Sequence, residues 1–248
     1  MGAATHPVPE NEEQRLAAVR RYDVLDTPPD GAFDRITTLA ARLFDVPISI
    51  ISIVDHDRIW FKSHYGIAAE EIGRDPGLCA SAVCQLEPWL VTNAAVDVRT
   101  IDNPLVAGEL GLRFYLGVPL VSGDGFNLGT LNVIDLEPRE VTEDEIRTLE
   151  DLAAIVMDEL ELRLDARAKL EDRRRRALEL NDEVVQGLAL AQLALHADKA
   201  EDAAEAVKHT LSAAQAIVAE LLESAGAEGR LHPGDLVRAS PAAVSSRR

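Results

Sequence analysis

The sequence predicts an α+β fold, and three features of its pattern carry this prediction. Two amphipathic helical segments precede a run of β-branched residues. Two pairs of strand-like segments are each joined by a polar turn, as in antiparallel hairpins. From residue 142 to residue 195 the apolar residues recur at three- and four-residue steps, and no proline interrupts them. Helices therefore bracket a mainly antiparallel sheet, and a long helix follows it.

Two helices are expected ahead of the sheet. The first opens at Asn11 or Glu12, carries Leu16, Val19 and Leu25 on one side, and ends at the proline- and glycine-containing turn 27–31. The second covers residues 33–44 and is stopped by Pro47, because proline has no N–H group to continue the helical hydrogen bonds.

The strands are predicted from runs of β-branched and aromatic residues. Segments 48–54 and 58–65 form one hairpin around a short polar turn. Segments 114–121 and 126–134 form a second hairpin around the turn at 122–125. The part between them is less regular, and we expect a short helix within 76–85, a strand at 89–92 and a helical turn within 103–110.

Composition limits the class of protein. The chain has 248 residues, 47% of them hydrophobic, which gives room for one full domain and a smaller unit. A net charge of −18 argues against a general nucleic-acid binder, since phosphate contacts need a surplus of Lys and Arg. There are two cysteines, no apolar leader and no long apolar run. We therefore expect a cytoplasmic protein that is neither secreted nor membrane-spanning.

The long helix has a well-marked start. Thr142 and Glu145 have the spacing of a capping box, and Val141 with Ile146 has that of a hydrophobic staple. A helix that continues to about Leu195 cannot bury its apolar stripe against one small domain. Pairing with a second copy is the simplest way to cover it, so we predict a parallel homodimer.

Many separated motifs follow one another in a characteristic order, among them Phe33-Asp34-Arg35-Ile36, Arg58-Ile59-Trp60-Phe61-Lys62-Ser63, Asp102-Asn103-Pro104, Gly117-Val118-Pro119-Leu120 and Leu128-Gly129-Thr130-Leu131-Asn132. Together they closely resemble, over residues 31–162, a bacterial GAF domain of the kind found ahead of histidine kinases and cyclases. The resemblance implies a six-stranded antiparallel sheet with a ligand-sized pocket on one face and the terminal helices on the other. The residues implied near that pocket are Trp60, Phe61, Tyr65, Arg113 and Tyr115.

No cofactor or metal is assigned from the sequence. An Arg beside aromatic residues suits an anionic or planar small ligand, although such an Arg is as often structural. The pattern of cyclic-nucleotide-binding GAF domains is not recognisable, and Ser81 stands where related domains carry a His that binds haem or bilin. Cys79 and Cys84 fit either a redox switch or two small buried residues. No cluster has metal-ligand spacing.

A shorter resemblance covers residues 176–195 and a second helix near 200–222. It is similar to the dimerisation and phosphoacceptor hairpin of histidine kinases of the nitrate-sensor class. Asp182 and Gln186 fit that pattern, but Asn181 stands where the family has its phosphoacceptor His. An amide nitrogen has no lone pair available to attack a phosphoryl group, so we expect no autophosphorylation. The 26 residues after Leu222 are too few for an ATP-binding lobe, which needs on the order of 100 residues.

These observations predict four segments. They are an N-terminal tail and helix (1–30), a GAF sensor domain (31–162), a coiled-coil linker with the hairpin (163–222) and a disordered tail (223–248). The predicted function is a cytoplasmic, non-catalytic signalling protein, with no enzymatic activity, in which two hairpins form a four-helix bundle and regulate a partner.

Two alternatives stay open. One is a phosphatase that acts on a response-regulator receiver domain through Asp182 and Gln186. The other is a pseudokinase that pairs with a true histidine kinase. The expected partners are therefore a second copy, a receiver domain or a histidine kinase, and neither nucleic acid nor membrane is expected.

Overall fold

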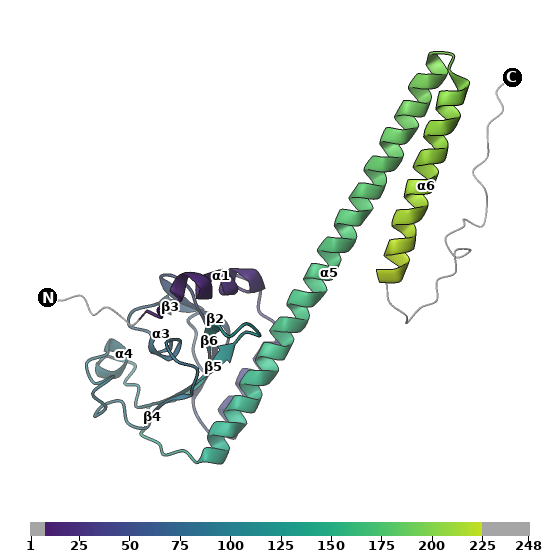
Figure 1. The fold of residues 1–248 in the computed structure, drawn as a ribbon. Coiled ribbons are helices and arrows are strands. Elements are labelled where there is room, and N and C mark those ends of the chain that lie inside the picture. Colours follow the sequence, from purple (N-terminus) through teal and green to yellow (C-terminus); the bar gives the residue numbers. More distant parts are fainter. Residues whose placement is uncertain (1–7, 225–248) are drawn as a thin grey trace. The chain divides into compact units, whose positions relative to one another are not determined.

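The computed structural model describes residues 8–224, and of residues 220–224 it describes the backbone alone. The chain divides into two compact units, Met1–Asp165 and Ala166–Arg248. The first unit contains the sheet and the second contains a helical hairpin. One helix, α5 (Glu143–His196), contributes residues to both units (Figure 1).

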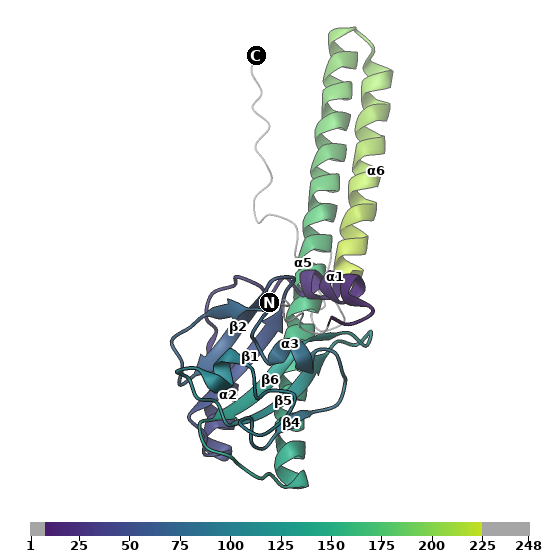
Figure 2. The same ribbon diagram turned by 90° about the vertical axis from the view of Figure 1, so that its left-hand side faces the viewer.

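The first unit is built on a six-stranded antiparallel sheet with the order β3-β2-β1-β6-β5-β4. Figure 2 shows β2, β1, β6, β5 and β4 side by side in this order. The strands are β1 (Ile48–Val54), β2 (Arg58–Tyr65), β3 (Glu71–Gly73), β4 (Trp89–Val91), β5 (Phe114–Val121) and β6 (Asn127–Asp135). The predicted α+β class and the six-stranded antiparallel sheet flanked by helices are thus confirmed.

Two long hairpins meet at the centre of the sheet, where β1 pairs with β6. Gly129 of β6 is required there, because a Cβ atom at this position would lie 1.9 Å from the Ser52 carbonyl oxygen. A bulge in β2 shifts the register, so that Ile51 pairs with Ser63 while Ser52 pairs with Phe61. The bulge places Lys62 and Ser63 toward the same face of the sheet as α2.

Within residues 8–142, four helices precede α5. They are α1 (Glu12–Tyr22), α2 (Gly31–Leu43) and the short α3 (Cys79–Ala82) and α4 (Pro104–Ala107). The side chain of Asp30 caps α2 by accepting a 2.9 Å hydrogen bond from the Ala32 N–H group. Helix α1 ends at Asp23, which has left-handed backbone geometry (φ 46°).

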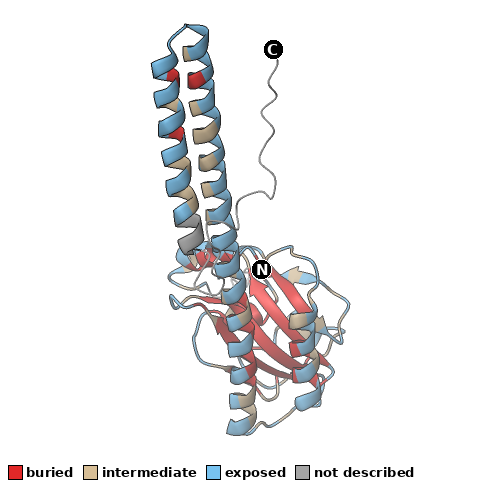
Figure 3. Cartoon of the chain, turned by 90° about the vertical axis from the view of Figure 1, so that its right-hand side faces the viewer, coloured by how far each residue is buried: buried red, intermediate tan, exposed pale blue. Residues whose placement is uncertain are grey.

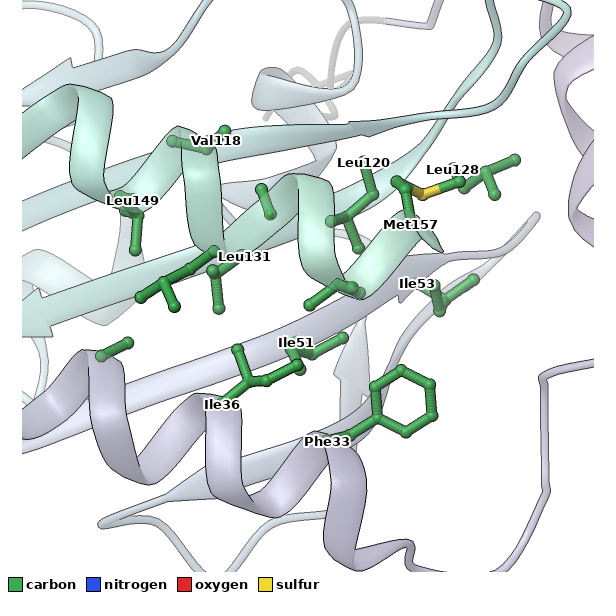
Figure 4. Packing of buried hydrophobic residues seen from close by; sticks show 14 of the residues in the cluster. Phe33, Ile36, Ile51, Ile53, Val118, Leu120, Leu128, Leu131, Leu149 and Met157 are labelled. Carbon is green, nitrogen blue, oxygen red and sulfur yellow. The ribbon is translucent and has the colours of Figure 1, made fainter. Parts of the chain in front are cut away.

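Two hydrophobic cores lie on opposite faces of the sheet. Side chains from α2 and α5 pack onto one face, as Figure 4 shows for Phe33, Ile36, Leu149 and Met157 against the strands. The other core lies under α3, α4 and their loops and includes Phe61, Cys79, Trp89 and Tyr115. In Figure 3 the strands are mostly buried, whereas the hairpin helices are mostly exposed.

Helix α5 begins as the sequence predicts. The Glu145 N–H group donates to Thr142 Oγ1 (3.2 Å), and the Thr142 N–H group donates to Glu145 Oε2 (2.7 Å), which is a complete capping box. In the first unit α5 buries Leu149, Leu152 and Val156 in the core. In the second unit it forms an antiparallel hairpin with α6 (Ala200–Ser224). No helix in residues 8–224 is long and apolar enough to cross a membrane.

The structure corrects three details of the prediction. Leu25 lies beyond the end of α1, because the helix stops at Tyr22. The short edge strand β3 was not predicted, since its three residues carry no alternating apolar pattern. Helix α6 extends through Ser224, so the predicted disordered tail starts two residues too early, and its remainder (225–248) lies outside the described residues.

Candidate functional site

The five residues predicted for a ligand pocket do not line a single cavity: Trp60 and Phe61 both line a pocket beside residues 26–29, whereas Tyr65, Arg113 and Tyr115 do not. Phe61 and Tyr115 face the core under α3, whereas Trp60 faces the core under α2. Neighbouring residues of a strand point to opposite faces, which separates Trp60 from Phe61. Tyr65 is 40% exposed at the end of β2.

Arg113 has a structural contact set. Its Nη1 atom donates to the carbonyl oxygens of Val106 (3.0 Å) and Leu112 (2.9 Å). The bond to Val106 holds α4 against the residue that precedes β5. A guanidinium group used in this way is directed at the backbone, so within the described residues no feature marks Arg113 as an anion clamp.

A buried polar cluster lies around Tyr115. The Tyr115 hydroxyl group lies 3.4 Å from both Cys79 Sγ and Thr130 Oγ1, and Asn132 Nδ2 donates to Thr130 Oγ1 at 3.1 Å. Gly117 makes room for the ring, because a Cβ atom there would lie 2.5 Å from the Tyr115 hydroxyl oxygen. Burial, followed by the nearby Cys79, raises the pKa of Tyr115 well above its usual value. The Tyr115 side chain is therefore a neutral group in this core.

Sequence reasoning missed Thr130 and Asn132 as members of this cluster. The Asn132 Oδ1 atom is buried and has no hydrogen-bond partner among the described residues. Buried amide oxygens without a partner are rare in native structures. The signal in the sequence is the pair Thr130 and Asn132 of β6, two polar residues that alternate with the apolar residues Leu131 and Val133.

The two cysteines are both free. Cys79 is buried, and Cys84 is exposed at the end of α3. Although the residue as a whole is exposed, partial desolvation of its sulfur raises the pKa of the Cys84 thiol. Within residues 8–224, no group of three or more His, Cys, Asp and Glu side chains is placed to hold a metal ion.

The hairpin divides the apolar residues of α5 between two sides. Leu180, Val184 and Ala191 are wholly or partly covered, as expected for residues facing α6. Gly187 faces Thr210 so closely that a Cβ atom on Gly187 would lie 1.7 Å from Thr210 Oγ1. Leu188 was predicted in the same stripe as Leu180, but it is 54% exposed. The predicted stripe is therefore two stripes, and only one is covered within the chain.

Leu188 and Leu211 lie on the same side of the hairpin. Each follows one residue after the facing pair Gly187 and Thr210. In antiparallel helices a step of one residue rotates both side chains by about 100° toward the same side of the pair. Other exposed apolar residues at helical spacing from Leu188 and Leu211 belong to the same surface, which we call the hairpin face. Its members are exposed by 45–62% and are Leu178, Val185, Leu188, Leu195, Val207 and Leu211.

Asp182 and Gln186 lie on another surface of α5. They are four residues apart, which places them on one side of the helix, and both are exposed. Asn181 is also exposed, but it lies three residues after Leu178 and seven before Leu188, which places it on the hairpin face. The Asp182 and Gln186 side chains are thus exposed to solvent, and their role toward a partner stays a prediction.

Residues 28–160 match the family model for the GAF domain. The chain belongs to the GAF family. The GAF domain is a signalling module, and the match confirms the sensor and signal-transduction class predicted from the sequence. The match ends at residue 160, so the likeness of the hairpin to a histidine kinase stays a prediction.

One curated relative is a cyclic di-GMP phosphodiesterase of Pseudomonas aeruginosa. It is 41% identical over 155 residues, which are 62% of this chain and 26% of the relative. This comparison contradicts the expectation that the chain has no enzymatic activity, because the relative is named as an enzyme. The chain spans about a quarter of the length of this relative.

Two solved structures illustrate the likeness to known proteins. The GAF domain of a phosphoenolpyruvate-protein phosphotransferase from Coxiella burnetii is 20% identical with a TM-score of 0.47, over 64% of this chain and 96% of that one. The free methionine-R-sulfoxide reductase of Neisseria meningitidis is 18% identical with a TM-score of 0.46, over 65% and 99% of the two chains. At these scores no function is transferred from either structure.

Proposed function

We propose that this chain is the sensory and relay part of a signalling protein, in which the GAF domain controls a dimerising hairpin that regulates a partner. The single observation that carries the proposal is the continuity of α5. Its first part packs in the GAF core through Leu149 and Val156, and its last part forms the hairpin. A change in how the GAF domain holds the helix can therefore bias the packing at the other end.

The occupant that we propose for the hairpin face is a second copy of the chain. The α5 members Leu178, Val185, Leu188 and Leu195 are separated by seven, three and seven residues, which is the repeat of a helix that pairs with another helix. Fully burying a Leu or Val corresponds to on the order of 100 Å² of apolar surface. The six members of the face, each about half exposed, would bury on the order of 300 Å² of apolar surface per copy, so flanking residues of the hairpin must supply the rest of the roughly 800 Å² per partner that stable interfaces bury.

The output under this control is proposed to be phosphoryl chemistry. The relative from Pseudomonas aeruginosa supports a link with cyclic di-GMP hydrolysis. A second candidate is hydrolysis of the aspartyl phosphate on a receiver domain. Exposed Asp182 and Gln186 favour it, because Gln186 can orient a water molecule and such hydrolysis depends mainly on positioning.

The dimer is tested by the solution mass of the full chain and of its variants Leu188→Lys and Leu211→Lys. A dimeric chain that becomes monomeric in both variants supports the proposal, since a lysine charge cannot be buried at a two-fold interface without a partner. The matched control is Leu193→Lys, which is also exposed (66%) but lies off the hairpin face. A wild-type chain that is monomeric at all concentrations overturns the proposal, and a mass that includes a histidine kinase would assign the face to a different partner.

The chemistry is tested by incubating the full chain with phosphorylated receiver domains and, separately, with cyclic di-GMP. For receiver dephosphorylation we expect Gln186→Ala to slow the reaction by about 10²-fold, as when a positioning group is lost. Gln14→Ala, an exposed glutamine on α1, should leave the rate unchanged. Equal rates with and without the protein, for every receiver and for cyclic di-GMP, would rule out both candidate activities.

A further inference from the structure

A pocket of about 550 Å³ opens between segment 26–29 and β2. It lies on the face of the sheet that carries α2, away from the buried cluster around Tyr115. Its volume falls within the range of small-molecule sites, which is roughly 300–1,000 Å³. The groups that line it and bear on its chemistry are Pro28, Pro29, Trp60, Lys62, Asp34 and Glu70.

Lys62 is the buried charge of this pocket. The residue is 5% exposed, and its ammonium group donates to Thr27 Oγ1 (2.7 Å) and to the Pro28 carbonyl oxygen (3.0 Å). The same group lies 5.3 Å from the centre of the Phe33 ring and 5.7 Å from that of Trp60. An ammonium group has three donors, so one is left without an acceptor among the described residues.

Three carboxylates surround the pocket, and they are not equivalent. Asp26 is neutralised by Arg58, whose two terminal nitrogens donate to it at 2.9 and 2.6 Å. Asp34 accepts a hydrogen bond from the Ser63 hydroxyl group at 2.7 Å but has no ion pair in the described part of the chain. Glu70 is exposed and likewise forms no ion pair within residues 8–224. One cation and two anions are therefore available to a ligand.

This set of charges selects the class of ligand. A simple anion that approached Lys62 would meet Asp34 and Glu70, and a simple cation would meet a buried lysine. A molecule with both charges satisfies both sides. We propose that this pocket binds a small zwitterion of the amino-acid class, with its carboxylate on Lys62 and its ammonium group between Asp34 and Glu70. Trp60, Pro28 and Pro29 supply an apolar wall for its side chain.

The pocket is connected to the relay helix through the residue that follows segment 26–29. Asp30 caps α2 and also pairs with Arg163 of α5 at 2.7 Å. The Arg163 guanidinium group lies 4.7 Å from the centre of the Phe33 ring, the ring that Lys62 also approaches. A ligand that competes with Thr27 and Pro28 for Lys62 therefore acts on the segment that leads into Asp30, the residue that pairs with α5. This signalling role rests on the proposed function, whereas binding itself does not.

Binding is tested by calorimetry of the full chain against each standard amino acid. For any amino acid that binds, the probes are the matching amine without the carboxylate and the matching acid without the amine. We expect both probes to bind at least about 10-fold more weakly, because each lacks one charge-assisted hydrogen bond. An absence of binding by every amino acid, or equal binding by either probe, would overturn the proposal.

Two variants locate the site. Lys62→Met should abolish detectable binding, and Glu70→Gln, on the exposed rim, should weaken it by about 3- to 10-fold. Glu87→Gln is the matched control, because Glu87 is exposed and does not line the pocket. Wild-type binding by a folded Glu70→Gln or Lys62→Met chain contradicts the assignment. The solution mass of the same samples separates the two proposals. A monomeric chain that binds an amino acid overturns the dimeric relay but not the pocket. A dimeric chain that binds no amino acid overturns the pocket but not the relay.

Discussion

The Tyr22 hydroxyl group of α1 donates a 2.5 Å hydrogen bond to Glu161 Oε1 of α5. The same carboxylate oxygen accepts a 3.3 Å hydrogen bond from the Gly123 N–H group in the turn between β5 and β6. Arg21, beside Tyr22, makes a bidentate ion pair with Asp124 of that turn. The N-terminal helix and the turn thus both bind α5 at Glu161, a few residues before the first unit ends at Asp165.

Replacing Tyr22 with Phe should lower the free energy of unfolding of the GAF unit by about 1 kcal/mol, the usual contribution of one hydrogen bond. Burial, followed by the hydrogen bond to Glu161, raises the pKa of Tyr22 from 10.0 to about 12. A raised pKa gives stability that is present below pH 10 and is lost as the pH rises toward 12. Denaturant unfolding between pH 7 and 11 checks this prediction. If the difference in free energy of unfolding between wild type and Tyr22→Phe did not shrink above pH 10, the prediction would be contradicted.

Among residues 8–224, Glu12 is the one carboxylate that pairs with both of two buried guanidinium groups. Its oxygens lie 2.7 Å from Arg15 Nε and 2.5 Å from Arg74 Nη1, and both Arg residues are at most 3% exposed. Removing one partner leaves buried charge uncompensated, so Glu12→Gln should cost on the order of 3 kcal/mol. Thermal and denaturant unfolding measure this loss. Glu13→Gln, on the exposed side of the same helix turn, should change stability by less than about 0.5 kcal/mol.

Glu12 also predicts a pH dependence. Burial raises the pKa of Glu12, but the hydrogen bonds and charges of Arg15 and Arg74 outweigh this effect and lower it below 4.5 overall. A lowered pKa gives stability that is present above pH 4.5 and is lost as the pH falls through the folded-state value. Acid unfolding curves should therefore converge for wild type and Glu12→Gln. Curves that stay parallel down to full acid unfolding would show that Glu12 contributes through shape alone.

Gly187→Ala should destabilise the hairpin, although alanine is the better helix former by about 1 kcal/mol. The new Cβ atom would lie 1.7 Å from Thr210 Oγ1 and 2.8 Å from Thr210 Cβ, both on α6. Overpacking of this kind costs about 1–3 kcal/mol and exceeds the gain in helix propensity. Adding Thr210→Ala removes the hydroxyl and methyl groups and should restore part of the loss. Helix content against temperature, followed by circular dichroism, measures both variants, and a more stable Gly187→Ala hairpin would refute the close contact.

Asp30 combines two roles that two substitutions separate. Asn keeps the cap on α2 but loses the ion pair with half-exposed Arg163, so Asp30→Asn should cost about 0.2–1 kcal/mol. Ala loses the cap as well, and the additional cost should be about 1 kcal/mol. Unfolding measurements on both variants check the difference. Equal stability of the Asn and Ala variants would show that the cap contributes nothing.

The pairing of Lys62 with segment 26–29 illustrates what sequence reasoning can and cannot reach. Local pattern identified β2, because its residues are β-branched or aromatic in a run of the right length. It did not reveal the bulge in β2, which depends on the pairing partner in β1. Alternation from Trp60 places Lys62 on the α2 side, but Ser63 lies on that side only because of the bulge, so the contribution of Ser63 to the pocket could not be anticipated.

The sequence by itself determined the α+β class, the bounds of β1 and β2, the capping box of α5 and the GAF family, since all of these depend on neighbours within a few residues or on motifs in order. Tertiary structure decided which predicted site residues meet. Trp60 and Phe61 are adjacent in the chain but lie in different cores, because a strand directs neighbouring side chains to opposite faces. It also decided that Leu180 and Leu188 belong to different surfaces, because the position of α6 against Gly187, and not the helical repeat alone, sets which side of α5 is covered.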